Sequence, residues 1–326
     1  MGAMDFQCGF GDETVYGTAP AMSRFFEYDK ESIHATAGRT EGDPLRVGSG
    51  YARSDRFTPY IEGAAGSLDM AVTTKGFGFF LKHMLGTVTT TGPAEVVAYT
   101  HTGTEGSLLG RSLSMQLNRP FNPSGTNQPF LYRGGKITDW TLSNSVDGNL
   151  LLSLGLDFMQ VDTATALATA TYPTGMDNFT WAGGAITVGG TAFDLTEFSL
   201  KNTSGLAVDR RQIRANTDKK EPTASRREGS FSLKADFDTM AQRNRVVAST
   251  RAGALATLTA VWNGPTLLGT TLFPQVAVTV PAARFDEWKG STESSDAISQ
   301  ELSGVVRYDA ASSPITIAIR TADTAP

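Results

Sequence analysis

The sequence predicts a mainly β protein, an antiparallel β-sandwich or barrel with one or two short flanking helices and long arms. Three observations lead to this fold class. Apolar and polar residues alternate with a period of two along short segments, one strand pair occurs twice, and only two stretches have helical spacing. The chain has 326 residues, of which 40% are hydrophobic and 19% charged, as in an ordinary globular protein. We expect one β domain with elaborations.

The repeated strand pair is the most informative feature. Residues 139–144 and 197–202 share one order of residue types: an acid, an aromatic residue, a hydroxyl residue, Leu, a variable residue and Asn. Residues 153–158 correspond in the same way to residues 232–237. The first copy, residues 135–158, contains the tight turn signal Asp147-Gly148 between its strands. The second copy, residues 194–237, carries the long loop 203–229 instead. The sequence therefore predicts one compact hairpin and a twin that carries an arm.

The two copies each have one apolar and one polar face, because successive strand residues point to opposite sides. The predicted apolar side chains are Trp140, Leu142, Leu154, Leu156 and Phe158, and in the twin Phe198, Leu200, Leu233 and Phe237. The predicted polar side chains are Asp139, Thr141, Ser143, Ser153 and Asp157, and in the twin Glu197, Ser199, Lys201, Lys234 and Asp236. This pattern is typical of antiparallel strands with a core face and a solvated face.

Residues 1–62 are predicted to form an N-terminal arm and loop for inter-subunit contacts, and residues 63–326 to form the β domain. Glycines interrupt the first segment and no period is sustained, yet aromatic residues are scattered through it. Aromatic side chains with little core of their own favour docking on another surface. The predicted contact residues here are Tyr16, Arg39, Arg46, Arg53, Arg56 and Phe57. The alternative is an irregular loop packed on its own domain.

Short elements follow along the chain. Residues 67–72 are predicted to be a strand and residues 75–85 a short helix that Gly86 ends. A second helix is predicted to begin after Asp238, as N-cap, and to end at Val247. Further strands are predicted at residues 96–100, 112–117, 254–262, 275–280, 298–308 and 315–319.

The composition limits the class of function. A net charge of -5 disfavours a dedicated nucleic-acid binder, which needs a basic surface for the phosphates. The single cysteine, Cys8, cannot form an internal disulfide and is expected to be a small buried hydrophobe. No apolar run is long enough for a membrane span, and no secretory signal is recognised at the N-terminus. We expect the chain to be assembled in the cytoplasm of its host cell.

Patterns for metal or nucleotide chemistry are weak. His34, His83 and His101 have no second His, Cys or carboxylate at metal-ligand spacing, so no metal site is predicted. Gly76-Phe77-Gly78 precedes a predicted helix, but Leu81 stands where a dinucleotide fingerprint needs its third glycine. No cofactor is predicted.

Two carboxylate pairs on the polar face have the residue types needed for glycoside hydrolysis, Asp139 with Asp157 and Glu197 with Asp236. A glycosidase cleft also needs aromatic platforms beside its carboxylates, and here the aromatic residues alternate onto the opposite face. Solvated charges on an exposed sheet are therefore the favoured interpretation, and no catalytic residue is predicted. A carbohydrate-binding or hydrolysing β protein remains the alternative from another functional class.

The loop 203–229 is basic in an otherwise acidic chain. Its predicted contact residues are Arg210, Arg211, Arg214, Lys219, Lys220, Arg226 and Arg227. Loops of this length in compact proteins are usually functional or disordered. A basic arm on an acidic body favours self-association, with the arm of one copy on the acidic surface of another. The alternative is a solvated flexible loop.

Several segments in order along the chain resemble the major tail tube protein of long-tailed, non-contractile, siphovirus-type bacteriophages. They are residues 11–19 (GDETVYGTA), 66–69 (GSLD), the short helix ending at Leu85-Gly86, residues 99–102 (YTHT), residues 132–137 (YRGGKI) before the first hairpin, and the long-looped hairpin followed by a helix. The similarity covers most of the chain and lies in pattern and arrangement. It contains no catalytic signature.

The resemblance implies a structural virion protein that stacks as hexameric rings into the tail tube, through which DNA passes into the host. An acidic lumen keeps DNA from adhering, so Asp139, Asp157, Glu197 and Asp236 are the lumen-facing candidates. By family analogy the arms bridge subunits and rings, and the partners are the tape measure, tail terminator and distal tail proteins. Either residues 163–190 or residues 275–326 are expected to be an outward elaboration. A tail terminator, baseplate or contractile-injection tube subunit is the alternative within the structural class.

Overall fold

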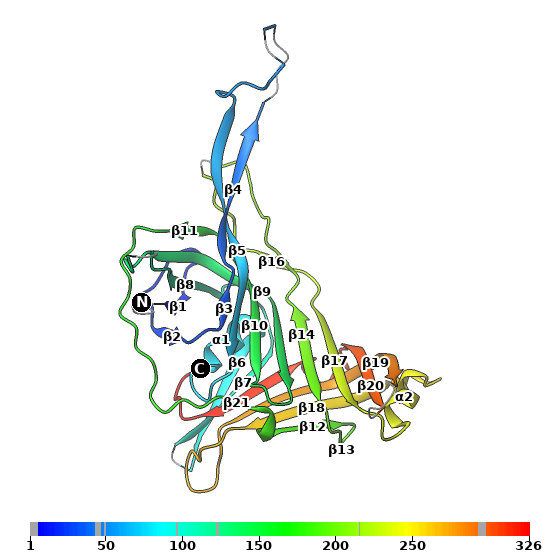
Figure 1. The fold of residues 1–326 in the computed structure, drawn as a ribbon. Coiled ribbons are helices and arrows are strands. Elements are labelled where there is room, and N and C mark those ends of the chain that lie inside the picture. Colours follow the sequence, from blue (N-terminus) through cyan, green and yellow to red (C-terminus); the bar gives the residue numbers. More distant parts are fainter. Residues whose placement is uncertain are drawn as a thin grey trace.

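The computed structural model describes residues 6–42, 47–48, 50–95, 97–121, 124–214, 216–292 and 298–326. Antiparallel strands make up most of it, and short helices lie beside them (Figure 1). Two sheets pack face to face over one core, so the predicted mainly β fold with sandwich packing is confirmed. Within the described ranges of a single chain, the sheets do not close into a barrel.

The larger sheet holds both predicted hairpins side by side. Its strands follow the order β5 (Phe57–Ala71), β10 (Leu151–Phe158), β9 (Pro129–Ser145), β14 (Glu197–Thr203), β17 (Glu228–Asp236), β20 (Ser299–Val306) and the second half of β19 (Gln275–Ser291). The two copies of the repeat meet where β9 pairs with β14, and Leu142 lies opposite Leu200 there. The repeat therefore builds the centre of one sheet.

The second sheet covers the apolar side of the first. Its strands follow the order β13 (Thr191–Ala192), β12 (Gly184–Val188), β18 (Leu255–Asn263), the first half of β19, β21 (Thr316–Thr321), β7 (Ala98–Glu105) and β6 (Gly86–Ala94). β19 runs through both sheets, and its pairing shifts register between Phe285 and Glu287. Residues 275–326 thus supply central strands, so of the two segments predicted as an outward elaboration only residues 163–190 remain a candidate.

A small third sheet extends the first half of β9. β2 (Arg24–Phe26) pairs with β1 (Gln7–Glu13), β1 with β8 (Ser112–Asn118), β8 with β9, and β9 with β11 (Gln160–Asp162). Cys8 and Phe10 on β1 are fully buried. The first part of residues 1–62 therefore belongs to the body, where a continuous arm was predicted, because its aromatic residues pack on the same chain's core.

The arm that does project is a β-hairpin. β4 (His34–Glu41) pairs with β5 from Ala65 to Phe57, and β3 (Lys30–Glu31) pairs with β5 nearer the body. Only residues 64–71 of β5 also pair with β10. Figure 1 shows this projecting hairpin, which we define as β4 with residues 57–63 of β5, extending away from both sheets.

Both predicted helices are present and are short. α1 (Gly78–Met84) lies between the sheets and buries Phe79, Phe80 and Met84. α2 (Ala241–Val246) follows β17 as predicted, and α3 (Arg251–Ala254), which was not predicted, has the side chain of Thr250 as its N-cap. A 3₁₀ turn, η1 (Trp181–Gly183), precedes β12.

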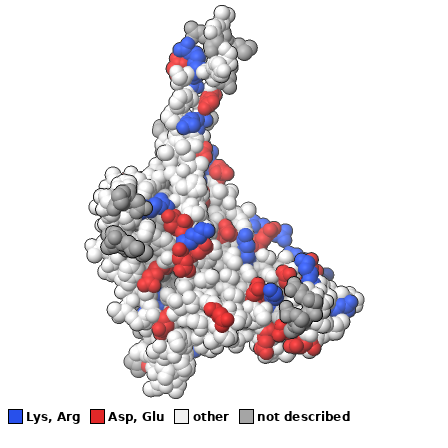
Figure 2. Space-filling view, in the orientation of Figure 1, with Lys and Arg blue, Asp and Glu red and all other residues white. Residues whose placement is uncertain are grey.

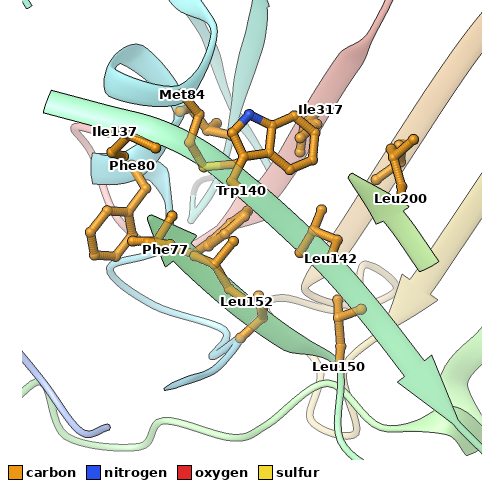
Figure 3. Packing of buried hydrophobic residues seen from close by; sticks show 14 of the residues in the cluster. Phe77, Phe80, Met84, Ile137, Trp140, Leu142, Leu150, Leu152, Leu200 and Ile317 are labelled. Carbon is orange, nitrogen blue, oxygen red and sulfur yellow. The ribbon is translucent and has the colours of Figure 1, made fainter. Parts of the chain in front are cut away.

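The core forms where the repeat meets α1 and the second sheet. Trp140, Leu142 and Leu152 from the larger sheet belong to one buried cluster with Met84 of α1 and Ile317 of β21, and Trp140 lies next to both (Figure 3). All of the side chains predicted for the apolar face of the first copy are buried. In the twin, Phe198, Leu200 and Leu233 are buried, and Phe237 is half-buried against Trp288. The period of two thus predicted the core face correctly.

Candidate assembly surfaces

The outward side of β10, β9, β14 and β17 is polar and largely open, and we call it the polar face. Thr141, Ser143, Ser153 and Ser199 are half-buried on it, and Lys201 and Lys234 are exposed. Of the acidic lumen candidates, Glu197 and Asp236 are exposed and Asp139 is half-buried. Their aromatic neighbours Trp140 and Phe198 are buried on the other side of the same strands. The structure therefore gives this face hydroxyls and charges without aromatic platforms from those strands.

Charges on the polar face are weakly coupled. Glu197 accepts a hydrogen bond from Lys234 Nζ at 3.0 Å across the β14–β17 pair, and both side chains are about half exposed. Such a surface ion pair contributes roughly 0–1 kcal/mol of stability. Carboxylates remain in excess on the outward side of the sheet from β10 to β20: Asp139, Glu197, Glu228, Asp236 and Glu301 against Lys201 and Lys234. The face is hydrophilic with an acidic balance.

Asp157 differs from the other acidic candidates, because the loop 203–229 covers it. Its side chain is 8% exposed, and its Oδ1 accepts a hydrogen bond from Lys219 Nζ at 2.7 Å. Burial raises the pKa of Asp157, and the ammonium of Lys219 opposes that rise. The alternation correctly predicted the side to which Asp157 points. It did not predict that a distant segment lies over that side.

Further contacts hold the same loop to the body. Lys136 Nζ, which is fully buried, donates to Glu221 Oε1 at 2.6 Å and to the Leu108 carbonyl at 2.7 Å. Burial lowers the pKa of Lys136, and the Glu221 carboxylate opposes that shift. Arg210 Nη1 donates to the Glu221 carbonyl. The loop 203–229 is therefore anchored by buried ion pairs rather than solvated throughout.

The loop also contacts the root of the projecting hairpin. Arg211 Nη1 and Nη2 donate to Glu62 Oε1 and to the Glu62 carbonyl, each at 3.0 Å, and its guanidinium lies 5.7 Å from the Tyr60 ring. Gly63 has φ +118°, and a Cβ there would lie 2.3 Å from the Phe158 carbonyl and 3.1 Å from Lys219 Cε. Glycine at this position lets the hairpin, β10 and the loop approach closely. The two predicted arms thus support each other.

The projecting hairpin exposes both of its sides. Every residue of β4 is exposed except half-buried Gly38. Phe57 and Ile61 on β5 are 46% and 49% exposed, and Arg39 lies opposite Pro59 between them. In the view of Figure 2, basic and acidic side chains alternate along the hairpin, while much of the body surface is uncharged. A two-stranded ribbon of this kind is marginally stable alone.

The other predicted contact residues have varied surroundings. Arg53 pairs with Asp55 at the exposed hairpin tip, where Arg56 also lies, and Arg46 lies outside the described residues. Tyr16 packs near Gly134, and its hydroxyl is buried without a hydrogen-bond partner. Arg227 donates to the carbonyls of Leu85 and Gly106.

In the loop itself, Arg214 donates to the Asp218 carbonyl, Lys220 is half-buried and Arg226 is exposed. The predicted set therefore divides into residues used within the subunit, such as Arg211, Lys219 and Arg227, and residues left on the surface, such as Arg39 and Arg226.

The histidines lie apart from one another in the fold. His101 on β7 contacts Thr90 Oγ1 and the Asp323 carbonyl, and His83 on α1 has Nε2 3.4 Å from Asp12 Oδ1. Within the described ranges, no three His, Cys, Asp or Glu side chains gather as a metal site. None of the helices described here is long and apolar enough to cross a membrane.

Sequence reasoning missed a groove at the end of the second hairpin, where Arg226 and Arg307 lie near Asn202. The repeat contained a signal for it. Nδ2 of Asn144 in the first copy donates to the Gly148 carbonyl, whereas Nδ2 of the equivalent Asn202 is buried without a partner.

Comparison with known proteins adds one finding. The family model described as phage tail tube protein matches residues 7–304, which is most of the chain. No curated protein matches the sequence. The matched range includes both copies of the repeat, the projecting hairpin and the loop 203–229.

Proposed function

Since the chain belongs to the phage tail tube protein family, we propose that its copies polymerise as stacked hexameric rings into the tube of a siphovirus-type tail. The family makes this a structural protein of the virion tail that self-assembles. The tube would serve as the conduit for DNA ejection into the host. Assembly would take place in the host cytoplasm, with the tape measure, tail terminator and distal tail proteins as partners.

The polar face is the observation that carries this proposal. A lumen that conducts DNA needs a wall with hydroxyls and like charge, because a basic wall would retain the phosphates. Asp139, Glu197 and Asp236 lie on such a face, opposite the buried core residues of the same strands. We propose these three as lumen residues. Asp157 is left out, because Lys219 and the loop 203–229 bury its carboxylate within the subunit.

The projecting hairpin supports the proposed contacts between copies. Residues 57–63 of β5 pair only with β4 among the described strands, so both edges of the hairpin keep unpaired backbone groups. A free sheet edge is a template for pairing with another chain. We propose that Arg39, Arg53, Arg56 and Phe57 contact a neighbouring subunit, together with Arg214, Lys220 and Arg226 of the loop.

The test is negative-stain electron microscopy of the purified full-length protein, concentrated with and without a tail-tip seed. Hollow filaments of stacked rings are the expected result. A particle that stays monomeric under every condition would contradict the proposal, and single closed rings would favour a terminator-like role. Glycan arrays on the same preparation address the carbohydrate-binding alternative, for which no binding is expected.

A further inference from the structure

A groove of about 570 Å³ opens where the ends of β14, β17 and β20 meet the ends of β7 and β21. Leu85, Val306 and Ile315 form its apolar part. Arg226, Arg227 and Arg307 also line it, and Glu105 is the single carboxylate among its lining residues. The groove therefore has an excess of positive charge in a chain whose net charge is -5.

Hydrogen-bond donors in this groove lack acceptors. Asn202 is 5% exposed, and its Nδ2 is buried without a partner, as is Nε of Arg307. Arg226 forms no ion pair with any residue that the structure describes. Arg227, by contrast, is used within the subunit through the carbonyls of Leu85 and Gly106. Buried polar groups normally have a partner, so an acceptor from another molecule fits this site.

The chemistry of the groove selects a particular ligand. Arginine side chains and an amide donor bind a carboxylate through charge-assisted hydrogen bonds. The neighbouring Val306 and Ile315 favour an apolar side chain next to that carboxylate. The fitting ligand is therefore a short exposed segment with one acidic and one apolar residue.

Such a segment lies at the other end of the same sheet. The turn between β9 and β10 carries Val146, 47% exposed, and Asp147, exposed with φ +63°. In the described part of the chain, the Asp147 carboxylate forms no ion pair. Asn202 pairs with Trp140, five residues before β9 ends, so the turn lies roughly 17 Å or more along the strand from the groove. The turn cannot reach the groove of its own chain.

The direction of the projecting hairpin makes the two sites complementary between copies. The hairpin leaves the sheet at the Ala64–Phe158 pair, which is the end of the sheet where Thr203 and the groove lie. A second copy that the hairpin approaches would turn the other end of its own larger sheet toward the groove, and that end carries Val146 and Asp147. A contact between different surfaces of identical chains closes into a ring or, where the rotation between copies does not close, repeats as an open stack.

We propose that this groove binds the β9–β10 turn of a second copy of the chain, with the Asp147 carboxylate held by Arg226 and Arg307 and Val146 beside Val306. This inference rests on the proposed function, since it names the contact between successive subunits of the tube. In this contact the Asn202 amide, which has no partner within the subunit, is an additional hydrogen-bond donor to the Asp147 carboxylate.

The first test is a charge swap in the full-length protein. Arg226→Glu and Asp147→Lys should each reduce tube formation at least about tenfold, because each places like charges in the contact. The double variant should restore assembly. Arg251→Glu, an equal charge change at an exposed residue of α3, is the matched control and should assemble normally. Thermal unfolding of each variant verifies that the subunit is folded. Absence of rescue with folded subunits would overturn the pairing.

The second test does not depend on tubes. Asn149→Cys in the turn and Ala224→Cys at the groove replace exposed residues and keep Asp147 and Arg226. The two variants are mixed and treated with bismaleimidoethane, and dimers should form in the mixture far more than with either variant alone. Cys8 is fully buried and burial raises its pKa, so the background reaction is low. If wild-type protein forms tubes and the cross-link does not form, the groove contact is refuted and the proposed tube function is not. If the cross-link forms and no tubes form, the groove contact is supported and the proposed tube is contradicted. If neither the cross-link nor tubes form, both proposals are contradicted.

Discussion

Single residues with buried charge hold the arms of this subunit in place. Lys219 meets Asp157, and Lys136 meets Glu221, each pair joining the loop 203–229 to the larger sheet. A buried pair gives little net stability compared with an apolar pair, but removal of one partner leaves an uncompensated charge. The pairs therefore specify where the loop lies more than they strengthen the fold.

Replacement of Lys219 by Met should destabilise the subunit by about 3–5 kcal/mol, because Asp157 then stays buried without a cation. The double variant Asp157→Asn, Lys219→Met should recover much of that loss. Urea unfolding of the wild type, both single variants and the double variant measures the coupling. Lys234→Ala, at the exposed pair with Glu197, is the control and should cost roughly 0–1 kcal/mol. Equal losses at both lysines would contradict the buried pair.

His83 predicts a pH dependence of stability. Burial lowers its pKa, against the opposing effect of Asp12. Burial also raises the pKa of Asp12, but its contact with His83 and its hydrogen bond from Lys82 bring it down to about 2. Both folded-state pKa values are depressed, so both groups contribute stability above their ordinary pKa values that is lost as the pH falls.

Below about pH 6.5 the unfolded chain binds a proton at His83 that the folded chain does not, so stability should fall by up to about 1.4 kcal/mol per pH unit. Chemical unfolding at pH 7, 6 and 5 measures this slope. His83→Gln should reduce it over that range, and His101, whose pKa burial also lowers, should keep the remainder of the slope. His34→Gln, at an exposed histidine, should leave it unchanged. An undiminished slope in the His83→Gln variant would contradict the role of His83.

At the scale of elements, the hairpin and the loop 203–229 are not equivalent arms. The hairpin contributes few buried residues beyond Gly63, whereas the loop covers Asp157 and Lys136. Deletion of the whole loop would leave these two charges without partners and destabilise the subunit itself. The hairpin is the element that can be shortened without unfolding the body.

Replacement of residues 39–59 by Asn-Gly should leave a folded subunit that does not stack. Gly38 still pairs with Tyr60, Asn-Gly forms a tight turn, and Arg211 keeps its contacts with Glu62. The melting temperature should change little, because the removed residues are exposed. Thermal unfolding, sedimentation velocity and electron microscopy check both halves of this prediction. Tubes of normal length from this variant would remove the hairpin from the contacts between rings.

At the scale of the whole molecule, the proposed lumen predicts a charge effect on DNA. Asp139→Lys, Glu197→Lys and Asp236→Lys together should give tubes that retain DNA in a salt-dependent way, because the wall would then attract phosphates. Wild-type tubes should not retain it. The control reverses three exposed acidic residues away from the polar face, Glu27, Asp29 and Asp309. Co-sedimentation of tubes with linear DNA at two salt concentrations measures retention, and equal retention by both variants would contradict the lumen assignment.

Local pattern was sufficient for several parts of this protein. The period of two around Trp140 and Leu200 predicted which side of each strand is buried, and the repeat predicted two hairpins, which pair through β9 and β14. Helical spacing predicted α1, and a helix after Asp238 was predicted as well, although Met240 is the N-cap of α2. These features depend on residues near one another in the chain, so the sequence by itself determined them.

Tertiary structure decided what covers each face. β1 pairs with β8 and β2 with β1 instead of projecting, β19 to β21 become central strands, and the loop 203–229 buries Asp157. The groove likewise forms from the ends of strands far apart in sequence. Alternation says only to which side a residue points. Whether that side meets solvent depends on which distant segment packs there, because strand pairing and buried ion pairs join residues without a fixed spacing along the chain.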